Sequence, residues 1–378
     1  MALAIALFLI TVAAVLFQFL SPWWLTPLAS NWQSMDDMLT ITLVVTGVFF
    51  VGLNLFLAYV VFRYRHRKGR RAAYEPDNSK LEKWLIWGTA VAIALLLAPG
   101  LVVYAKYLDS PRNALTVEAL GQQWQWRFRF PGQNGKLGPT DPHFISADNP
   151  FGIDPADPDG QSNILIDNNE LHLPLNQPVK MLLRSRDVLH DFFVPEFRAR
   201  MNLVPGMITS FWFTPTKAGR YEVMCAQLCG VGHSNMRGTI VVEDPAAFAA
   251  WLKQQPTFAQ TQQKTAGGGD ELARQGKLLA QAKGCVACHS VDGSPGVGPT
   301  WKGLFGKNET MADGSTVRVD EAYLQNFIRN PTARAIKGYP PIMPPIALTD
   351  QELAALVAYI KSDAGTAQPA TTAQQSGG

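Results

Sequence analysis

The sequence predicts a multidomain membrane protein in which a two-helix transmembrane hairpin precedes an all-β domain and an all-α domain. Three observations support this prediction: two uncharged apolar runs near the N-terminus, short alternating apolar runs in the middle, and a helical pattern around a C-x-x-C-H motif towards the end. A chain of 378 residues is long enough for two or three folding units.

The first predicted domain, residues 26–109, is a transmembrane helix hairpin. Its spans, about 38–62 and 84–105, are each long enough to cross a hydrocarbon core of about 30 Å as a helix. The connecting segment 63–83 carries eight Lys/Arg against three Asp/Glu. Because such basic loops stay in the cytoplasm, everything after Lys106 is expected on the outer side, and a nucleic-acid partner is not indicated.

Residues 1–25 form a third apolar segment with two open interpretations. A cleaved signal peptide agrees with a mature N-terminus outside, but such signals usually begin with basic residues, and the first Lys or Arg here is Arg63. The alternative is a retained extra membrane span.

The second predicted domain, residues 110–253, is an all-β sandwich or barrel. Short runs with strand-like alternation are separated by turn-rich segments, and a Pro/Asp/Gly cluster at 154–160 suits an exposed loop. The expected strands include Leu115–Val117, Trp124–Phe130, Val179–Arg184, Met207–Phe213 and Gly238–Val242.

A cluster of soft metal ligands lies late in this domain. Cys225, Cys229, His233 and Met236 fall within twelve residues, and His190 comes from an earlier segment. Thiolate, imidazole and thioether groups favour copper over calcium or magnesium, and a second thiolate allows two coppers to share both sulfurs. The alternative is a C-x-x-x-C disulfide beside an unrelated histidine.

The order Trp124-Gln-Trp126, then His190, then C-x-x-x-C-x-x-x-H-x-x-M resembles the CuA domain of cytochrome c oxidase subunit II over about residues 26–250. The resemblance implies a cupredoxin-like fold and a binuclear copper centre. Cys225 and Cys229 would bridge the coppers, His190 and His233 would each bind one, Met236 would be a weak axial ligand, and the Gln227 carbonyl would fill the other axial position. It also makes Trp124 the candidate for electron entry, although an aromatic residue in a strand is ordinarily a packing residue.

Three further positions are interpreted through the same resemblance. Gln227 and Asn202 stand where many members have Glu and Asp, and the Glu helps to hold magnesium, so the sequence leaves open whether a magnesium site exists. Glu82, at the cytoplasmic end of the second span, resembles a family Glu at a proton entrance, and an ordinary boundary charge is the alternative. His66, His143 and His172 have no ligand-like neighbours, so structural or solvated roles are expected.

The polar segment 254–269 ends in three glycines and predicts a flexible linker. The domain after it, residues 270–363, contains Cys285-Val-Ala-Cys288-His289, which is the attachment signature of haem c. Cys285 and Cys288 would form thioethers to the haem, and His289 would bind its iron. Residues 364–378 are small and polar, and are expected to be disordered.

This region resembles a class I cytochrome c over about ninety residues, which implies one covalently bound haem with Met343 as its second axial ligand. Met311 is the rival ligand. Met/His ligation gives the high potential of an electron carrier. In that fold Gly276 and Tyr359 would form the contact between the first and last helices, and Thr349 with Glu352 forms a capping box.

Together these features predict subunit II of a proton-translocating cytochrome c oxidase with a fused cytochrome c. Electrons would pass from the haem to CuA and on to subunit I, which reduces oxygen to water. The expected location is a bacterial plasma membrane, with several spans and both cofactor domains on the periplasmic side. Expected partners are subunits I and III and a donor, either a soluble or membrane cytochrome c or another respiratory complex.

A copper-delivery factor on a membrane anchor is the alternative function, because such proteins also combine C-x-x-x-C with a distant histidine. The second histidine, Met236 and the haem motif argue against it.

Overall fold

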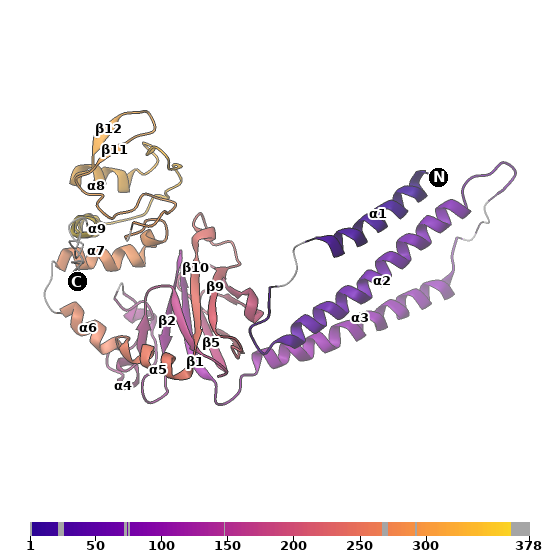
Figure 1. The fold of residues 1–378 in the computed structure, drawn as a ribbon, viewed down its shortest axis with the longest axis horizontal. Helices are drawn as coiled ribbons and strands as arrows, with labels where there is room; N and C mark the ends of the chain where they lie inside the picture. The colour runs from indigo at the N-terminus through magenta and orange to yellow at the C-terminus, as the bar shows by residue number, and fades with distance from the viewer. Residues whose placement is uncertain are drawn as a thin grey trace, which may run out of the picture.

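The computed structural model describes residues 2–21, 26–71, 74, 76–146, 148–266, 271–291 and 293–363. It is an elongated molecule with apolar helices at one end, a β-sandwich in the middle and a helical domain at the other end (Figure 1). The predicted disordered tail, 364–378, lies outside the described residues.

Within the described residues, three helices rather than the predicted two are long and apolar enough to cross a membrane: α1 (Ala2–Leu20), α2 (Gln33–Arg63) and α3 (Ser79–Leu108). The two-helix hairpin therefore describes only part of the apolar region. α1 runs beside α2, and α2 and α3 lie antiparallel (Figure 1). Most apolar side chains of these helices are exposed, as they must be on a surface that faces lipid.

The outer ends of α2 and α3 are bound to the β-sandwich. Asp36 of α2 forms an ion pair with Arg198, at 2.6 Å from its Nε. The Trp212 indole donates a hydrogen bond to the Lys106 carbonyl at 2.7 Å. The Trp32 indole in turn donates to the Trp212 carbonyl at 2.9 Å. These contacts fix the sandwich at the ends of the two helices.

The middle domain is a sandwich of two five-stranded sheets. In sheet order the first contains β3 (Ile164–Ile166), β2 (Gln125–Phe130), β1 (Leu115–Gln122), β5 (Val179–Ser185) and β8 (Thr209–Phe213). The second contains β4 (Glu170–Pro174), β10 (Arg237–Glu243), β9 (Gly219–Cys225), β6 (His190–Val194) and β7 (Ala199–Leu203). Most pairs are antiparallel, but β1 with β5 and β4 with β10 are parallel. The short helix α4 (Pro158–Gln161) lies in the predicted exposed loop.

The sandwich core consists of apolar residues that alternate along the strands. Phe128, Met181, Phe192 and Phe211 are completely buried. Trp124 lies outside β2, in the turn between β1 and β2, so the strand is shorter than expected. This turn becomes important for the site because it projects from the end of the sandwich towards the helical domain.

The expected linker at 254–269 is largely helical in the structure. Helix α5 (Pro245–Gln254) closes the sandwich, and α6 (Phe258–Ala266) follows it. Phe258 is completely buried beside Leu120 and Phe151, so the first turn of α6 is bound to the sandwich. This attachment could not be predicted from the sequence, because a single aromatic residue before a polar stretch forms no apolar pattern. The three glycines of the predicted linker lie outside the described residues.

The C-terminal domain is built from α7 (Glu271–Ala282), α8 (Glu321–Arg329) and α9 (Asp350–Asp363), with a hairpin of β11 (Asn308–Thr310) and β12 (Thr316–Arg318) that the all-α prediction did not include. Gly276 of α7 lies directly against α9, and a Cβ there would collide with the Ala355 carbonyl and approach the Tyr359 Cβ at 2.8 Å. The predicted contact between first and last helices is confirmed.

Candidate metal and haem site

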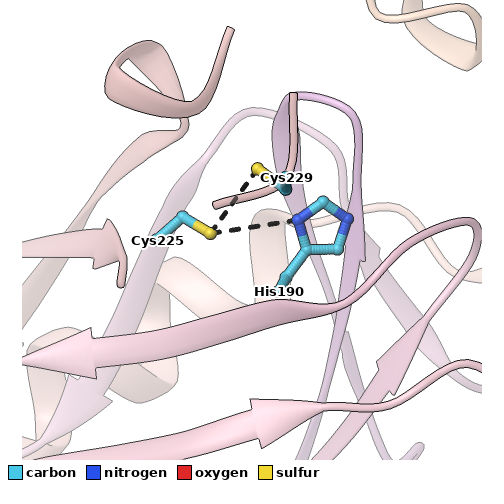
Figure 2. A group of neighbouring side chains, drawn as sticks. All are labelled: His190, Cys225 and Cys229. Carbon is cyan, nitrogen blue, oxygen red and sulfur yellow. Dashed lines mark hydrogen bonds between the residues drawn. The ribbon is translucent and has the colours of Figure 1, made fainter. Parts of the chain in front are cut away.

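Three of the predicted metal ligands converge at one end of the sandwich (Figure 2). His190 begins β6, Cys225 ends β9, and Cys229 lies in the following loop; their ligand atoms all lie within 4.8 Å of one another, and all three residues are buried. The two sulfurs are 3.7 Å apart, and Nδ1 of His190 is 3.9 Å from the Cys225 sulfur. The β6–β9 pairing produces this convergence because it sets Phe192 beside Cys225.

The other three predicted copper ligands surround this cluster. Nδ1 of His233 lies 3.5 Å from the Cys229 sulfur, and the Gln227 carbonyl oxygen lies 3.2 Å from the Cys225 sulfur. Met236 is completely buried, and its carbonyl accepts a hydrogen bond from the Cys225 amide at 3.1 Å. All six residues therefore lie in or beside one compact cluster.

The two cysteines share a proton unequally. A hydrogen bond from the Cys229 thiol lowers the pKa of Cys225, and the same bond raises the pKa of Cys229. The lowered pKa favours the thiolate form of Cys225. Thiolate is the form of cysteine that binds metals, so the chemistry of the donor set fits copper.

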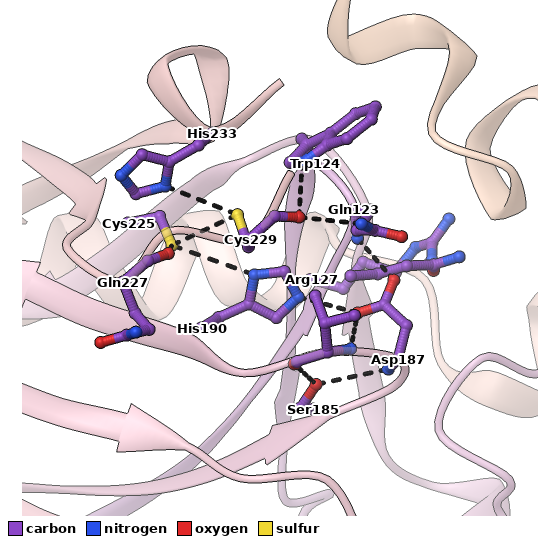
Figure 3. A network of polar contacts seen from close by, with 12 residues as sticks. Gln123, Trp124, Arg127, Ser185, Asp187, His190, Cys225, Gln227, Cys229 and His233 are labelled. Atoms are coloured by element: carbon purple, nitrogen blue, oxygen red, sulfur yellow. Dashed lines mark hydrogen bonds and ion pairs between the residues drawn. The ribbon is translucent and has the colours of Figure 1, made fainter. Parts of the chain in front are cut away.

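Asp187 orients the His190 ring by contacting Nε2, the nitrogen that does not face Cys225. Its Oδ1 lies 2.8 Å from Nε2 of His190, and its Oδ2 accepts a hydrogen bond from the Gln123 amide at 2.8 Å (Figure 3). Burial alone would lower the pKa of His190, but the bonds to Asp187 and Cys225 raise it. A carboxylate on the second ring nitrogen is the usual support for a metal-binding imidazole, because it fixes the orientation and tautomer of the ring.

The turn between β1 and β2 contacts the same cluster from the other side. The side-chain amide of Gln123 donates to the Cys229 carbonyl at 2.8 Å, and the Trp124 indole donates to that carbonyl at 3.2 Å (Figure 3). Sequence analysis named Trp124 but missed Gln123 and Asp187. The one available signal for Asp187 was its position three residues before His190.

A pocket with about 1030 Å³ of open space, mouth included, surrounds the C-x-x-C-H motif. Cys285, Cys288, His289 and Met343 all line it. Nδ1 of His289 lies 2.8 Å from the Pro299 carbonyl, so its proton is held there and Nε2 is left to bind iron. Burial lowers the pKa of His289, which favours the neutral, metal-binding imidazole.

The rival ligand Met311 lies elsewhere. It is 1% exposed, and its sulfur accepts a hydrogen bond from the Tyr323 hydroxyl at 3.9 Å.

Trp124 and Val231 of the β-sandwich also line the haem-type pocket, so residues of both domains form it. Glu82 lies in the first turn of α3, on the helix that leads to the sandwich.

Two histidines have the structural surroundings expected of them. His172 lies between Glu243 at 2.8 Å and Glu170 at 3.0 Å, and its ring stacks on Trp251 at 4.1 Å. His143 bonds to Asp141 at 2.6 Å.

Comparison with known proteins assigns both domains to families. Residues 115–244 match the periplasmic domain of cytochrome c oxidase subunit II, and residues 273–363 match cytochrome c. The chain is 53% identical over 259 residues to the alternative cytochrome c oxidase subunit 2 of Bradyrhizobium diazoefficiens, an alignment that covers 68% of this chain and 94% of that relative. The chain belongs to the cytochrome c oxidase subunit II family.

Two further proteins are similar to this chain. Cytochrome c oxidase subunit 2 of Cereibacter sphaeroides is 26% identical, with 61% of this chain and 77% of the relative covered. The periplasmic domain of subunit II of cytochrome oxidase from Bradyrhizobium japonicum matches with 28% identity and a TM-score of 0.29, over 38% of this chain and 95% of that structure.

Family membership makes this subunit II part of an oxidoreductase that assembles with subunit I of the oxidase. The subunit II domain implies copper, and the cytochrome c domain implies haem. The apolar helices are long enough to anchor the protein in a membrane, and the family model that matches residues 115–244 describes a periplasmic domain.

Proposed function

We propose that this subunit carries electrons from a covalently bound haem c to a binuclear CuA centre and on to subunit I, where oxygen is reduced to water and protons are translocated. The observation that carries the proposal is the position of Trp124. Its side chain lines the pocket around the haem motif, and its indole donates to the carbonyl of Cys229 at 3.2 Å. One residue therefore contacts both candidate cofactor sites.

The copper centre would be held by the residues of the compact cluster. Cys225 and Cys229 would bridge the two metals, and His190 and His233 would each bind one. The burial of His190, Cys225 and Cys229 supports this arrangement, as does the approach of the imidazoles to the sulfurs. The axial groups would be the Met236 thioether and the Gln227 carbonyl. A buried, internally bonded ligand set needs little rearrangement when its metals change oxidation state.

The haem would be attached through Cys285 and Cys288 and bound axially by His289 and Met343. The Pro299 carbonyl fixes the ring of His289, and the 340–344 loop brings Met343 to the same pocket. A Met/His pair raises the potential of the haem, which suits a donor to copper.

We place the protein in a bacterial plasma membrane as a multi-pass subunit. α2 and α3 cross it, the basic loop between them is cytoplasmic, and both cofactor domains are periplasmic. Subunit III is a further expected partner. A soluble or membrane cytochrome c, or another respiratory complex, would reduce the haem.

Paramagnetic resonance of the full chain loaded with copper, with optical spectra recorded in parallel, tests this proposal. One unpaired electron shared by two equivalent coppers, together with a low-spin haem c, is the expected result. A single-copper signal, or copper that a chelator removes readily, would contradict the relay and favour copper delivery.

A further inference from the structure

The turn between β1 and β2 has two faces, and only one of them contacts the copper ligands. Gln123 and Trp124 point to the Cys229 loop, whereas Gln122 and Gln125 are directed to the helical domain. Hairpin turns normally lie in solvent, yet Gln122 is 8% exposed and Gln125 is 5% exposed. Their burial requires a partner surface.

That surface is the C-terminal end of α7, immediately before the haem attachment motif. The Gln122 amide donates to the Ala282 carbonyl, and the Gln125 amide donates to the Gln281 carbonyl. The last four carbonyls of a helix lack partners within the helix and carry the negative end of its dipole, so they are natural acceptors for such donors.

The Gln122 amide is held with its NH₂ group outward. Its Oε1 accepts a hydrogen bond from Nη1 of Arg127 at 2.6 Å, and Arg127 in turn forms an ion pair with Asp167. With the oxygen so occupied, the nitrogen is left to donate to Ala282. Contacts within the sandwich therefore orient the Gln122 NH₂ group towards the helical domain.

Two contacts beside these hydrogen bonds show how closely the domains meet. Gly284 adopts a left-handed conformation with φ of 73°, and a Cβ there would collide with the Gln123 carbonyl. Val231, which lies between the predicted copper ligands Cys229 and His233, lines the pocket around Cys288. The haem attachment segment therefore lies directly on the copper-ligand loops.

We propose that the side-chain amides of Gln122 and Gln125 form a docking site for the end of α7, which holds this chain's own haem domain over the copper centre. This inference rests on the proposed function. It adds the docking surface through which the electron transfer from haem to copper would take place within one chain. Because the tether keeps the domain at a high effective concentration, two hydrogen bonds between neutral groups are sufficient to favour the docked arrangement.

The test compares the full chain with the double variant Gln122→Glu/Gln125→Glu, in which carboxylates would face the carbonyl oxygens. Hydrogen–deuterium exchange of residues 122–125 and 281–284 reports docking independently of the metals. Flash reduction of the haem reports the rate of transfer to copper. Loss of one such hydrogen bond is worth about tenfold in an equilibrium constant, so at least tenfold slower transfer is expected, together with faster exchange in both segments.

Two further variants complete the design. Gln122→Ala/Gln125→Ala should also speed exchange in both segments and slow electron transfer to copper, but by smaller factors. Gln161→Glu is the matched control, because the Gln161 amide also donates to a carbonyl, that of Pro155 at 2.6 Å, but within a surface loop. It should change neither reading.

Unchanged exchange in both double variants would overturn the docking site. Faster exchange with an unchanged transfer rate would keep the docking site and contradict the electron route of the proposed function instead.

Discussion

At the scale of single residues, the copper cluster depends on groups that do not bind metal themselves. Asp187 is the clearest example, because one carboxylate holds both the His190 ring and the Gln123 amide, each at 2.8 Å. It thereby couples a ligand of the proposed copper centre to the turn that contacts the haem domain.

Replacing Asp187 with Asn keeps the shape of the side chain but removes the charge that holds the imidazole. Loss of such a supporting group weakens metal binding by about 10- to 100-fold, so copper should pass that much more readily to a competing chelator. Asp141→Asn is the control, because Asp141 pairs with His143 away from the cluster. Equal copper retention in the two variants would show that Asp187 does not support the centre.

Glu82 tests a different part of the proposal. If it admits protons from the cytoplasm, Glu82→Gln should slow oxygen reduction by the assembled oxidase while leaving the copper spectrum unchanged. Asp77→Asn alters a carboxylate in the basic segment just before α3 and should have no effect on turnover. Unchanged turnover in Glu82→Gln would discard this role.

At the scale of the element, the cap of α9 is the feature that sequence analysis anticipated most fully. The Glu352 amide donates to the Thr349 hydroxyl at 3.2 Å, and the Thr349 amide donates to the Glu352 carboxylate at 2.7 Å. The predicted capping box is confirmed.

Thr349→Ala should destabilise the haem domain, because N-cap replacements cost about 0.5–2 kcal/mol. For a domain of this size, thermal unfolding followed by haem absorbance should shift down by several degrees. Thr316→Ala, an exposed position on β12, should leave the transition in place. An equal shift in both variants would argue against a specific role of the cap.

The same cap predicts a pH dependence. The bond from the Thr349 amide lowers the pKa of Glu352 from its ordinary value of 4.5. A depressed carboxyl pKa contributes stability above the ordinary value, and this contribution is lost as the pH falls through the folded-state value. The stability difference between the parent and Glu352→Gln should therefore be largest near neutral pH and vanish in acid. A difference that persists unchanged below pH 4.5 would contradict it.

The sequence predicted those parts of the molecule whose determinants are close together in the chain. The spacing of Cys225, Cys229 and His233 identified the cluster, and the C-x-x-C-H motif identified the haem domain. The sequence did not predict the roles of Gln122, Gln125 and Asp187. These roles depend on contacts with segments that are distant in the chain and close only in the folded structure. The helix at Phe258 was missed because a single buried aromatic leaves no periodic pattern.

At the scale of the whole molecule, the apolar helices lie at one end, the β-sandwich in the middle and the helical domain at the other end (Figure 1). Trp124 lies between the copper-type cluster and the haem-type pocket, because its indole donates to the Cys229 carbonyl and the residue lines the pocket. One ion pair and indole hydrogen bonds fix the sandwich to the helices, and the end of α7 lies on the β1–β2 turn at the opposite side. This order supports the proposed electron transfer within one chain.

Time-resolved reduction of the haem in the copper-loaded full chain tests that consequence most directly. After a flash from a photoreductant, the haem should reoxidise and the copper centre should become reduced with one shared rate constant that is independent of protein concentration. A haem that stays reduced, or a rate that rises in proportion to protein concentration, would show that electrons do not pass within the chain and would contradict the account.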